Sequence, residues 1–356
     1  MEHPLASSLP GRADPELAAG TDPPASWDRD LTRRWRSLRD AITGAEPGAS
    51  IDLAQTPGLA TSHRILDVEL DDAGTVYVLY TYPMRAPIRR VVAYDSSGRF
   101  AGRVGASERS EQRLRVPRAM ALLDGNRLAV VQQYGDVAVF SRTPDGFVLN
   151  AARPVDLPAS DICGGQGRTY VTQRRSPQAI HELELGRGRG GHSFGSVYGY
   201  GSGLARNALS EGILACLEAP ARVVFGFRTV PRLDAYDADS GERIWTAGVM
   251  DYAQGVFVEQ VRPRHAITSP VNYPRERLVR LLPVSPEFLL AVYARSHNEP
   301  EARVETRTYL IHADTGEGAM ISDTLPIIGA IRGDIYVTVG EASASAVRFR
   351  YMRPDR

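Results

Sequence analysis

The sequence predicts an all-β protein, a single six-bladed β-propeller in which every blade is a four-stranded antiparallel sheet. Three observations support this prediction: a repeated unit, an alternating pattern inside it and a tight turn that closes it. Short runs rich in β-branched and aromatic residues recur about every 50 residues, a period typical of propellers and solenoids. The six runs cover residues 75–80, 127–133, 169–173, 222–227, 288–293 and 334–339.

Each of these runs lies between two further strand candidates. An apolar run precedes it, and a strand with alternating apolar and polar residues follows it, as in DVAVF (136–140) and RLDAY (232–236). Alternation with a period of two is typical of a half-buried strand. The pattern therefore predicts three strands in each of six units.

A fourth strand follows through a tight turn in most units. The turns read YDSSGRF (94–100), YDADSGERIW (236–245) and HADTGEGAM (312–320). Asp or Ser followed by Gly provides the left-handed backbone that such turns require. The spacing of Asp237, Asp239 and Glu242 loosely resembles a set of calcium ligands, but the ligands that complete an EF-hand loop are missing. We therefore interpret this segment as a turn.

The residues that precede the repeats form two further segments. Residues 1–25 are rich in Pro, Ala, Gly and Asp without apolar periodicity, which predicts a flexible tail. A short amphipathic helix is predicted over 26–44, with Ser26 as its N-cap and Gly44 as its stop. Its apolar stripe consists of Leu31, Trp35, Leu38 and Ile42. The other face is basic; we expect the stripe to pack on the protein's own domain, and docking on a membrane or partner is the alternative.

An N-terminal strand is predicted to complete the last blade. The sixth unit stops after three strands near residue 353, while a strand candidate at 51–55 has no place in the first unit. Pairing the two would remove the open edges of the ring, so we assign 49–356 to one propeller. A βαβ fold fails because no helical pattern separates the strands, and two stacked sandwiches predict no sixfold spacing.

Composition excludes several classes of function. The formal net charge is zero and all 42 strong bases are arginine, without one lysine. Balanced charge argues against a nucleic-acid binder, and the lack of lysine excludes a Schiff base or a phosphate-loop lysine. The chain has no H-E-x-x-H motif, and none of its seven histidines lies two to four residues from another. No catalytic residue, cofactor or metal is therefore assigned.

The sequence does not fix the compartment. No run of eighteen apolar residues is present, so no transmembrane helix is predicted. The N-terminus lacks a basic segment followed by an apolar core, which argues for a cytoplasmic protein. The alternative is an exported protein whose signal is absent from this sequence.

The two cysteines occupy matching positions in neighbouring units. Cys163 lies eight residues before Val171, and Cys216 lies eight residues before Val224. Because the inner strands of neighbouring blades approach one another, we predict a disulfide between blades three and four, which requires Cα atoms within about 7 Å. Such a bond favours an oxidising compartment. The alternative is two small buried apolar side chains.

Two pairs of segments carry a family resemblance. They are VVAYDSSGRFAGRVG (91–105) with VPRAMALLDGNRLAVVQQYGDVAVF (116–140), and SDICGGQGRTYV (160–171) with ILACLEAPARVVFGF (213–227). Over nearly the whole folded part, the chain resembles the six-bladed propellers of the NHL and TolB-like type, in particular a broad group of bacterial proteins. That group has no shared known activity, and many members are exported. The chain departs from the group at SERSEQRLR (107–115), where a Gly-Pro-Gly-Glu-like loop is common.

The predicted site residues leave two functions open. Asp67, Asp161 and Glu218 lie on or beside expected inner strands and could line a central channel, while a long insertion over 253–277 could form its rim. The rim candidates are Arg262, Arg264 and His265. We expect a non-enzymatic propeller that binds a small molecule or a protein of unknown identity, in an undetermined oligomeric state. The alternative is a channel hydrolase or lyase similar to six-bladed lactonases, which hold calcium with acidic and amide side chains.

Overall fold

The structure is a computed structural model, and it describes most of the strands and turns of the chain. The residues that it describes are 16–17, 20–56, 64–81, 89–105, 114–123, 127–133, 135–144, 146–154, 159–165, 167–173, 176–185, 190–198, 203–253, 257–261, 264–268, 275–296, 304–340 and 346–352.

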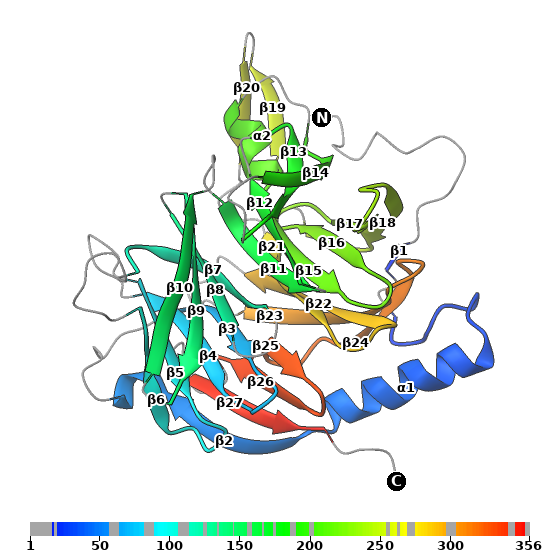
Figure 1. Ribbon diagram of the computed structural model, residues 1–356. Helices are drawn as coiled ribbons and strands as arrows, with labels where there is room; N and C mark the ends of the chain where they lie inside the picture. Colours follow the sequence, from blue (N-terminus) through cyan, green and yellow to red (C-terminus); the bar gives the residue numbers. More distant parts are fainter. Residues whose placement is uncertain are drawn as a thin grey trace. The chain divides into compact units, whose positions relative to one another are not determined.

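Six blades, each with four antiparallel strands, confirm the predicted six-bladed β-propeller (Figure 1), and a short parallel strand, β1 (Glu16–Leu17), extends one of them to five strands. Blade 1 contains β3 (Arg64–Leu70), β4 (Val76–Thr81), β5 (Arg89–Tyr94) and β6 (Phe100–Val104). Blade 2 contains β7 (Pro117–Leu122), β8 (Arg127–Gln132), β9 (Asp136–Thr143) and β10 (Gly146–Pro154). Blade 3 contains β11 (Ala159–Gly165), β12 (Arg168–Gln173), β13 (Gln178–Leu183) and β14 (Gly190–Ser196).

The second half of the chain forms the other blades. Blade 4 contains β15 (Gly212–Leu217), β16 (Arg222–Phe227), β17 (Arg232–Asp237) and β18 (Arg243–Val249). Blade 5 contains β21 (Arg275–Pro283), β22 (Phe288–Ser296), β23 (Val304–His312) and β24 (Gly318–Ser322). Blade 6 contains β25 (Ile327–Arg332), β26 (Ile335–Val339), β27 (Ala346–Tyr351) and β2 (Glu46–Asp52).

The chain divides into two compact units, which we describe separately. Unit 1 comprises residues 1–39, 174–180 and 193–325 and holds blades 4 and 5. Unit 2 comprises 40–173, 181–192 and 326–356 and holds blades 1, 2 and 6, and blade 3 contributes strands to both. The first strands of successive blades are neighbours inside each unit, in the orders β25, β3, β7, β11 and β15, β21.

The N-terminal strand completes the last blade, as the sequence predicts. β2 pairs antiparallel with β27, with Ile51 opposite Val347 and Asp52 opposite Ala346. The strand lies earlier than the predicted 51–55, because the Asp52 side chain accepts a hydrogen bond from the Ala54 amide and starts a 3₁₀ turn over Leu53–Gln55. Blade 6 is therefore built from both ends of the described chain.

The predicted hairpin turns are confirmed at atomic detail. In the turn of blade 1, Asp95 accepts hydrogen bonds from the amides of Ser97 and Arg99, and Gly98 has a left-handed φ of 80°. Asp237 of blade 4 likewise accepts from the amides of Asp239 and Ser240. In a tight turn some backbone amides have no backbone acceptor. The aspartate carboxylates accept hydrogen bonds from these amides, which explains why Asp occurs in the turns.

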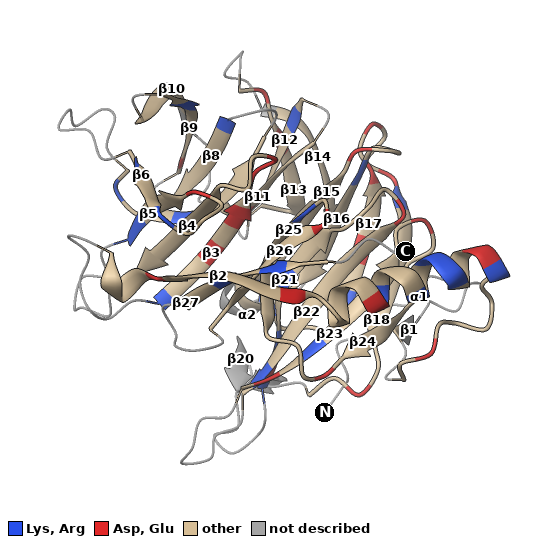
Figure 2. Ribbon diagram, turned by 90° about the horizontal axis from the view of Figure 1, so that it is seen from below, with Lys and Arg blue, Asp and Glu red and all other residues tan. Residues whose placement is uncertain are grey.

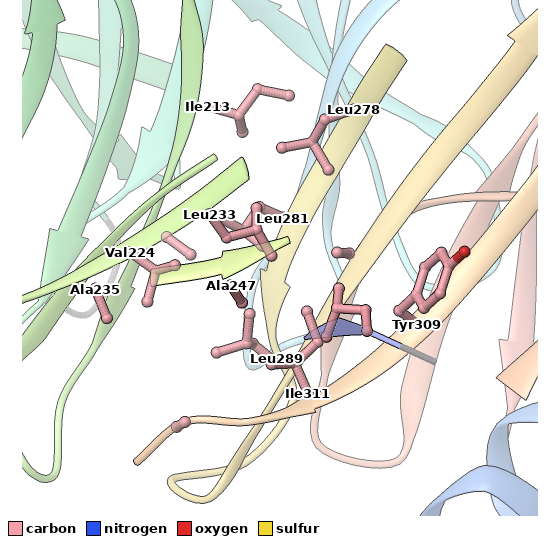
Figure 3. Packing of buried hydrophobic residues seen from close by; sticks show 14 of the residues in the cluster. Ile213, Val224, Leu233, Ala235, Ala247, Leu278, Leu281, Leu289, Tyr309 and Ile311 are labelled. Carbon is pink, nitrogen blue, oxygen red and sulfur yellow. The ribbon is translucent and has the colours of Figure 1, made fainter. Parts of the chain in front are cut away.

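The core of unit 1 is a continuous apolar layer between blades 4 and 5 (Figure 3). Val224, Leu289 and Tyr309 in this layer have no exposed surface. The alternating strands prove to be buried on both faces rather than half buried, since β9 and β17 each bury four consecutive residues. Stacked blades cover both faces of an inner strand, so any polar residue in it needs a partner inside the protein.

Part of the predicted flexible tail is a strand. β1 (Glu16–Leu17) pairs in parallel with β18, and Leu17 has no exposed surface. The prediction of a tail over 1–25 is therefore wrong for these two residues. Leu17 joins the apolar layer of unit 1, and burying a leucine there contributes about 1.5–3 kcal/mol.

The predicted N-terminal helix forms as α1 (Arg29–Thr43). Its start is three residues later than predicted, since Asp28 rather than Ser26 accepts a hydrogen bond from the Leu31 amide. The stripe packs on the protein itself: Trp35 is fully buried, and its indole N–H donates to the Leu310 carbonyl at 3.3 Å. A second, short helix, α2 (Gly203–Leu209), was not predicted.

Candidate functional site

Asp67, a predicted channel acid, holds two blades together. It lies on β3 and is partly buried. One carboxylate oxygen accepts from the Val68 amide and the other from the Met120 amide of β7, each at 3.0 Å. By accepting from one amide in each blade, this carboxylate positions blade 1 against blade 2.

The other two predicted acids lie in different settings. Asp161 is partly buried on β11, at a register shift between Ala159 and Ile162. Asp161 and Asp67 thus both lie on the first strand of a blade in unit 2, where β7 contacts both β3 and β11. Glu218 lies in unit 1, exposed in the turn between β15 and β16.

The predicted rim lies partly outside the described residues. The insertion over 253–277 contains a hairpin of β19 (Phe257–Val261) and β20 (Arg264–Thr268), in which His265 pairs with Gln260. Arg264 and His265 are on β20, but their side chains, like the whole of Arg262, lie outside the described residues. The rim stays a prediction.

Both cysteines are buried on first strands of their blades. Cys163 lies on β11 with 7% of its surface exposed, and Cys216 lies on β15 with 9% exposed. The pairing of the two cysteines with each other stays a prediction.

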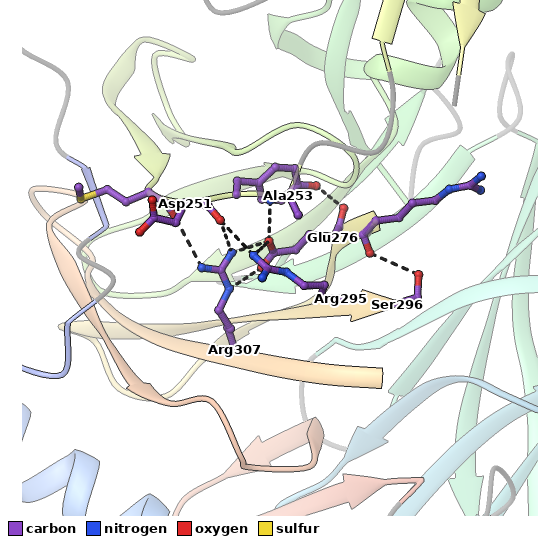
Figure 4. Close-up of polar contacts among 9 residues, drawn as sticks. Asp251, Ala253, Glu276, Arg295, Ser296 and Arg307 are labelled. Carbon is purple, nitrogen blue, oxygen red and sulfur yellow. Dashed lines mark hydrogen bonds and ion pairs between the residues drawn. The ribbon is translucent and has the colours of Figure 1, made fainter. Parts of the chain in front are cut away.

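A buried cluster of one glutamate and two arginines was not predicted (Figure 4). Glu276 on β21 has a side chain without exposed surface. The Arg307 guanidinium of β23 binds both of its oxygens, with Nε at 2.6 Å from one of them. Arg295 of β22 and the Ala253 amide donate to the second oxygen at 3.2 and 2.9 Å. We call these three charged side chains the Glu276 cluster.

The Glu276 cluster fastens the segment after β18 onto blade 5. Both arginines donate to the carbonyl of Asp251, whose φ of 54° is unusual for a residue other than glycine. The Tyr252 hydroxyl donates to the Glu276 carbonyl at 2.5 Å. Burial raises the pKa of Tyr309, beside Arg307, to about 12, so this phenol stays protonated. These hydrogen bonds and ion pairs form a structural clamp between the segment after β18 and blade 5.

Asp234 on β17 shows the same arrangement in blade 4. Its side chain has no exposed surface and accepts from Arg232 Nε at 2.9 Å, from the Thr246 hydroxyl at 2.8 Å and from the Tyr236 hydroxyl at 3.2 Å. Burial raises the pKa of Tyr236 well above its usual range. The acidic residue of the RLDAY motif is therefore a satisfied core group.

A pocket of about 410 Å³ lies in unit 2, beside the turns that end β7 and β11. It is lined by Leu123, Arg127, Gly165, Gly167, Arg168, Thr169, Glu182, Leu183, Glu184 and Leu185. Arg168 donates to both oxygens of Glu182, at 2.6 and 3.1 Å, and this hydrogen bonding lowers the pKa of the Glu182 carboxyl. The volume falls in the range of small-molecule sites. We call it the Arg168 pocket.

Among the residues that the structure describes, no three His, Cys, Asp or Glu side chains are grouped to hold a metal ion. Within the same residues, no helix is both long and apolar enough to span a membrane.

Solved structures of other propellers are similar to this chain. A member of the DUF4221 family from Bacteroides vulgatus has a TM-score of 0.52 at 11% identity, over 87% of this chain and 97% of that one. A putative exported protein from Bacteroides fragilis has 0.55 at 10% identity, over 88% and 96%. U3-55K has 0.51 at 9% identity, over 86% and 100%. No protein-family model and no curated protein matches the chain. Identities this low show the fold alone.

Proposed function

We propose that this propeller is a non-enzymatic binding protein of the NHL or TolB-like repeat type, and that the Arg168 pocket holds its ligand. The single observation that carries the proposal is the pocket itself, where Arg168 is held by Glu182 beside leucine side chains. A cation fixed by a second side chain is pre-organised for recognition, because less side-chain entropy is lost when a ligand binds.

The composition of the pocket indicates the class of ligand. Two arginines face two glutamates, so the formal charges of the lining balance. Three leucines supply apolar contact, and glycines at 165 and 167 leave the backbone open to a ligand. A small molecule with both charge signs and an apolar group, such as a short peptide, matches this lining better than a phosphate does.

The carboxyl groups support binding rather than catalysis. Among the described carboxyl groups, hydrogen bonds to the charged form lower the pKa of Asp72, Asp95, Glu182 and Asp237. A general acid needs the opposite shift, toward neutral pH. Asp67, which the hydrolase alternative would use, is bound to two backbone amides.

A set of leucine-containing dipeptides would test the pocket by thermal shift. We expect at least one to raise the melting temperature, and Leu185→Trp, which fills the pocket, to abolish that shift. Val148→Trp is the matched control, since Val148 is half exposed on β10 and lies outside the pocket. An equal loss in both variants, or no stabilisation by any dipeptide, would contradict the proposed site.

Chelation separates binding from the calcium-dependent alternative. A bound ion that stabilises the folded state makes the melting temperature depend on its concentration. We expect EDTA and added calcium to leave the melting temperature unchanged. A calcium-dependent rise would instead support the lactonase-like hypothesis.

We also propose that Cys163 and Cys216 bond to each other, because they occupy matched positions on β11 and β15. The expected intact mass under non-reducing conditions is about 2 Da below that of the reduced chain, since the bond removes two hydrogens. Two alkylatable thiols in the unreduced, unfolded protein would exclude the bond.

A further inference from the structure

Helix α1 presents a row of arginines to solvent. Arg29, Arg33 and Arg36 are all exposed, and their spacing of four and three residues places them along one face over about 10 Å. The helix carries five arginines and two aspartates in a chain whose formal net charge is zero. Figure 2 shows blue and red bands along this helix. Basic charge is therefore concentrated on α1.

The other arginines of α1 have partners in its own unit. Arg34 binds Glu287 of blade 5 at 2.8 Å, and the Arg39 guanidinium lies 5.3 Å from the centre of the Trp35 ring. In the described part of the chain, neither Arg29 nor Arg36 forms an ion pair, and Arg33 has only an exposed pair with Asp30 at 2.9 Å. Exposed pairs of this kind contribute little and exchange readily. The three arginines are free to bind another molecule.

These arginines line a shallow groove with a fixed wall. The groove measures about 470 Å³ and is lined by Trp27, Arg29, Thr32, Arg33, Arg36 and Ser37. The Trp27 indole N–H donates to Glu317 at 2.9 Å, and its ring packs against Trp35, Phe288 and His312. A packed aromatic ring beside exposed guanidinium groups is a common recognition surface for an acidic segment.

Two other anionic partners fit the groove less well. Insertion into a membrane needs a free apolar face, and the apolar stripe of α1 is already used, since Trp35 is fully buried. Single-stranded nucleic acid needs an aromatic face on which a base can stack, and Trp27 is already packed by three rings. An acidic polypeptide needs only the guanidinium groups and the hydroxyls of Thr32 and Ser37.

We propose that the face of α1 formed by Arg29, Arg33 and Arg36 is a docking surface for an acidic segment of another protein. Carboxylates spread over about 10 Å would each meet one guanidinium. This surface lies in unit 1 and is separate from the Arg168 pocket of unit 2. The two proposals therefore stand or fall independently.

Fluorescence anisotropy with a labelled twelve-residue peptide of alternating Glu and Ala tests this surface on the full chain. At about 150 mM salt, we expect the triple variant Arg29→Gln, Arg33→Gln, Arg36→Gln to bind the peptide about tenfold more weakly than the unmodified chain. The salt dependence of the affinity should also be shallower, because fewer ion pairs form.

A second triple variant controls for the loss of three charges. Arg64→Gln, Arg115→Gln, Arg277→Gln removes three exposed arginines that lie outside α1 and should leave the peptide affinity unchanged. Equal weakening in both triple variants would overturn the proposal, as would the same affinity for a peptide of alternating Gln and Ala.

Competing partners are separated in the same assay. Tighter binding of phosphatidylserine vesicles or of single-stranded DNA, lost in the α1 triple variant, would overturn the assignment to an acidic protein. The pocket variant Leu185→Trp should leave the peptide affinity unchanged, so a failure of the pocket proposal is distinguishable from a failure here.

Discussion

Two groups of arginines in unit 1 show how one residue type takes two roles. Arg295 and Arg307 surround the buried carboxylate of Glu276 and donate to it and to nearby carbonyls. Arg29, Arg33 and Arg36 of α1 are exposed, and among the residues that the structure describes their one ion pair is the exposed one between Arg33 and Asp30. Burial and pairing, not residue type, separate a structural guanidinium from one that is available to bind.

The two roles differ in how the free-energy cost of removing a guanidinium from water is offset. A guanidinium withdrawn from water must regain its hydrogen bonds inside the protein, so a buried arginine needs a fixed partner. Burial alone would lower the pKa of Arg307, but its bonds to Glu276 raise it overall, so the charge is retained. An exposed guanidinium keeps its water until a partner displaces it.

Glu276→Gln should have the largest effect, because it leaves two partly buried arginines without a countercharge. Removing one partner of a buried ion pair typically costs about 3–5 kcal/mol of unfolding free energy. Urea denaturation measures this loss. Glu287→Gln is the matched control, since its pair with Arg34 is about half exposed, and it should cost less than about 1 kcal/mol. Similar losses of unfolding free energy in both variants would show that the buried pairs of Glu276 and the exposed pair of Glu287 contribute equally to stability.

Trp35→Phe should have an intermediate effect, because it removes the indole donor to Leu310 and part of the buried ring. A lost hydrogen bond and reduced packing together predict about 1–2 kcal/mol. The measurement is again urea denaturation, with Trp27→Phe as the comparison at a partly exposed position. No loss of stability would show that the apolar stripe does not anchor the helix.

Glu182→Gln should have a smaller effect that depends on pH. Hydrogen bonding to Arg168 lowers the pKa of Glu182 in the folded state below its ordinary 4.5. The folded state therefore binds fewer protons than the unfolded chain, and the stabilisation is complete above about pH 4.5 and lost as the pH falls through the folded pKa. Denaturation measured at pH values from 7 to 3 should show the unfolding free energies of the variant and the unmodified chain converging as the pH falls. A difference in unfolding free energy that grows as the pH falls would contradict this explanation.

The α1 triple variant should have the smallest effect on folding. Exposed substitutions away from caps and cores stay within about 0.5 kcal/mol. Thermal and urea denaturation of Arg29→Gln, Arg33→Gln, Arg36→Gln should match the unmodified chain. A loss above about 1 kcal/mol would show that these arginines stabilise the fold.

The fold could be predicted from sequence because its signals are local and repeated. Asp95 and Asp237 each form a turn with residues that follow them directly, and β2 was found because the sixth unit lacks a strand. Helix α1 was placed by its apolar spacing, while its start was wrong because Ser26 and Asp28 are both good N-caps. Ser26 instead donates to Glu317, a contact 291 residues away in the sequence.

The charged clusters could not be predicted because their partners are distant in sequence. Glu276 and Arg307 are 31 residues apart, on β21 and β23, which lie on either side of β22. In RERLVR the glutamate looks like any solvent-facing residue of an alternating strand. The Glu276 side chain is buried because neighbouring strands and blades cover both faces of an inner blade strand. Asp67 is the opposite case. The sequence predicts that it lines a channel, and in the structure its carboxylate accepts a hydrogen bond from the Met120 amide of the neighbouring blade.

The most direct test of the difference between the buried and the exposed arginines uses two variants, Glu276→Gln and the α1 triple variant. Unfolding free energy and affinity for the Glu-Ala peptide are determined for each in one buffer. The account predicts that Glu276→Gln loses stability and keeps its affinity, while the triple variant keeps its stability and loses affinity. It would be contradicted if either variant lost both, or if the triple variant lost stability alone.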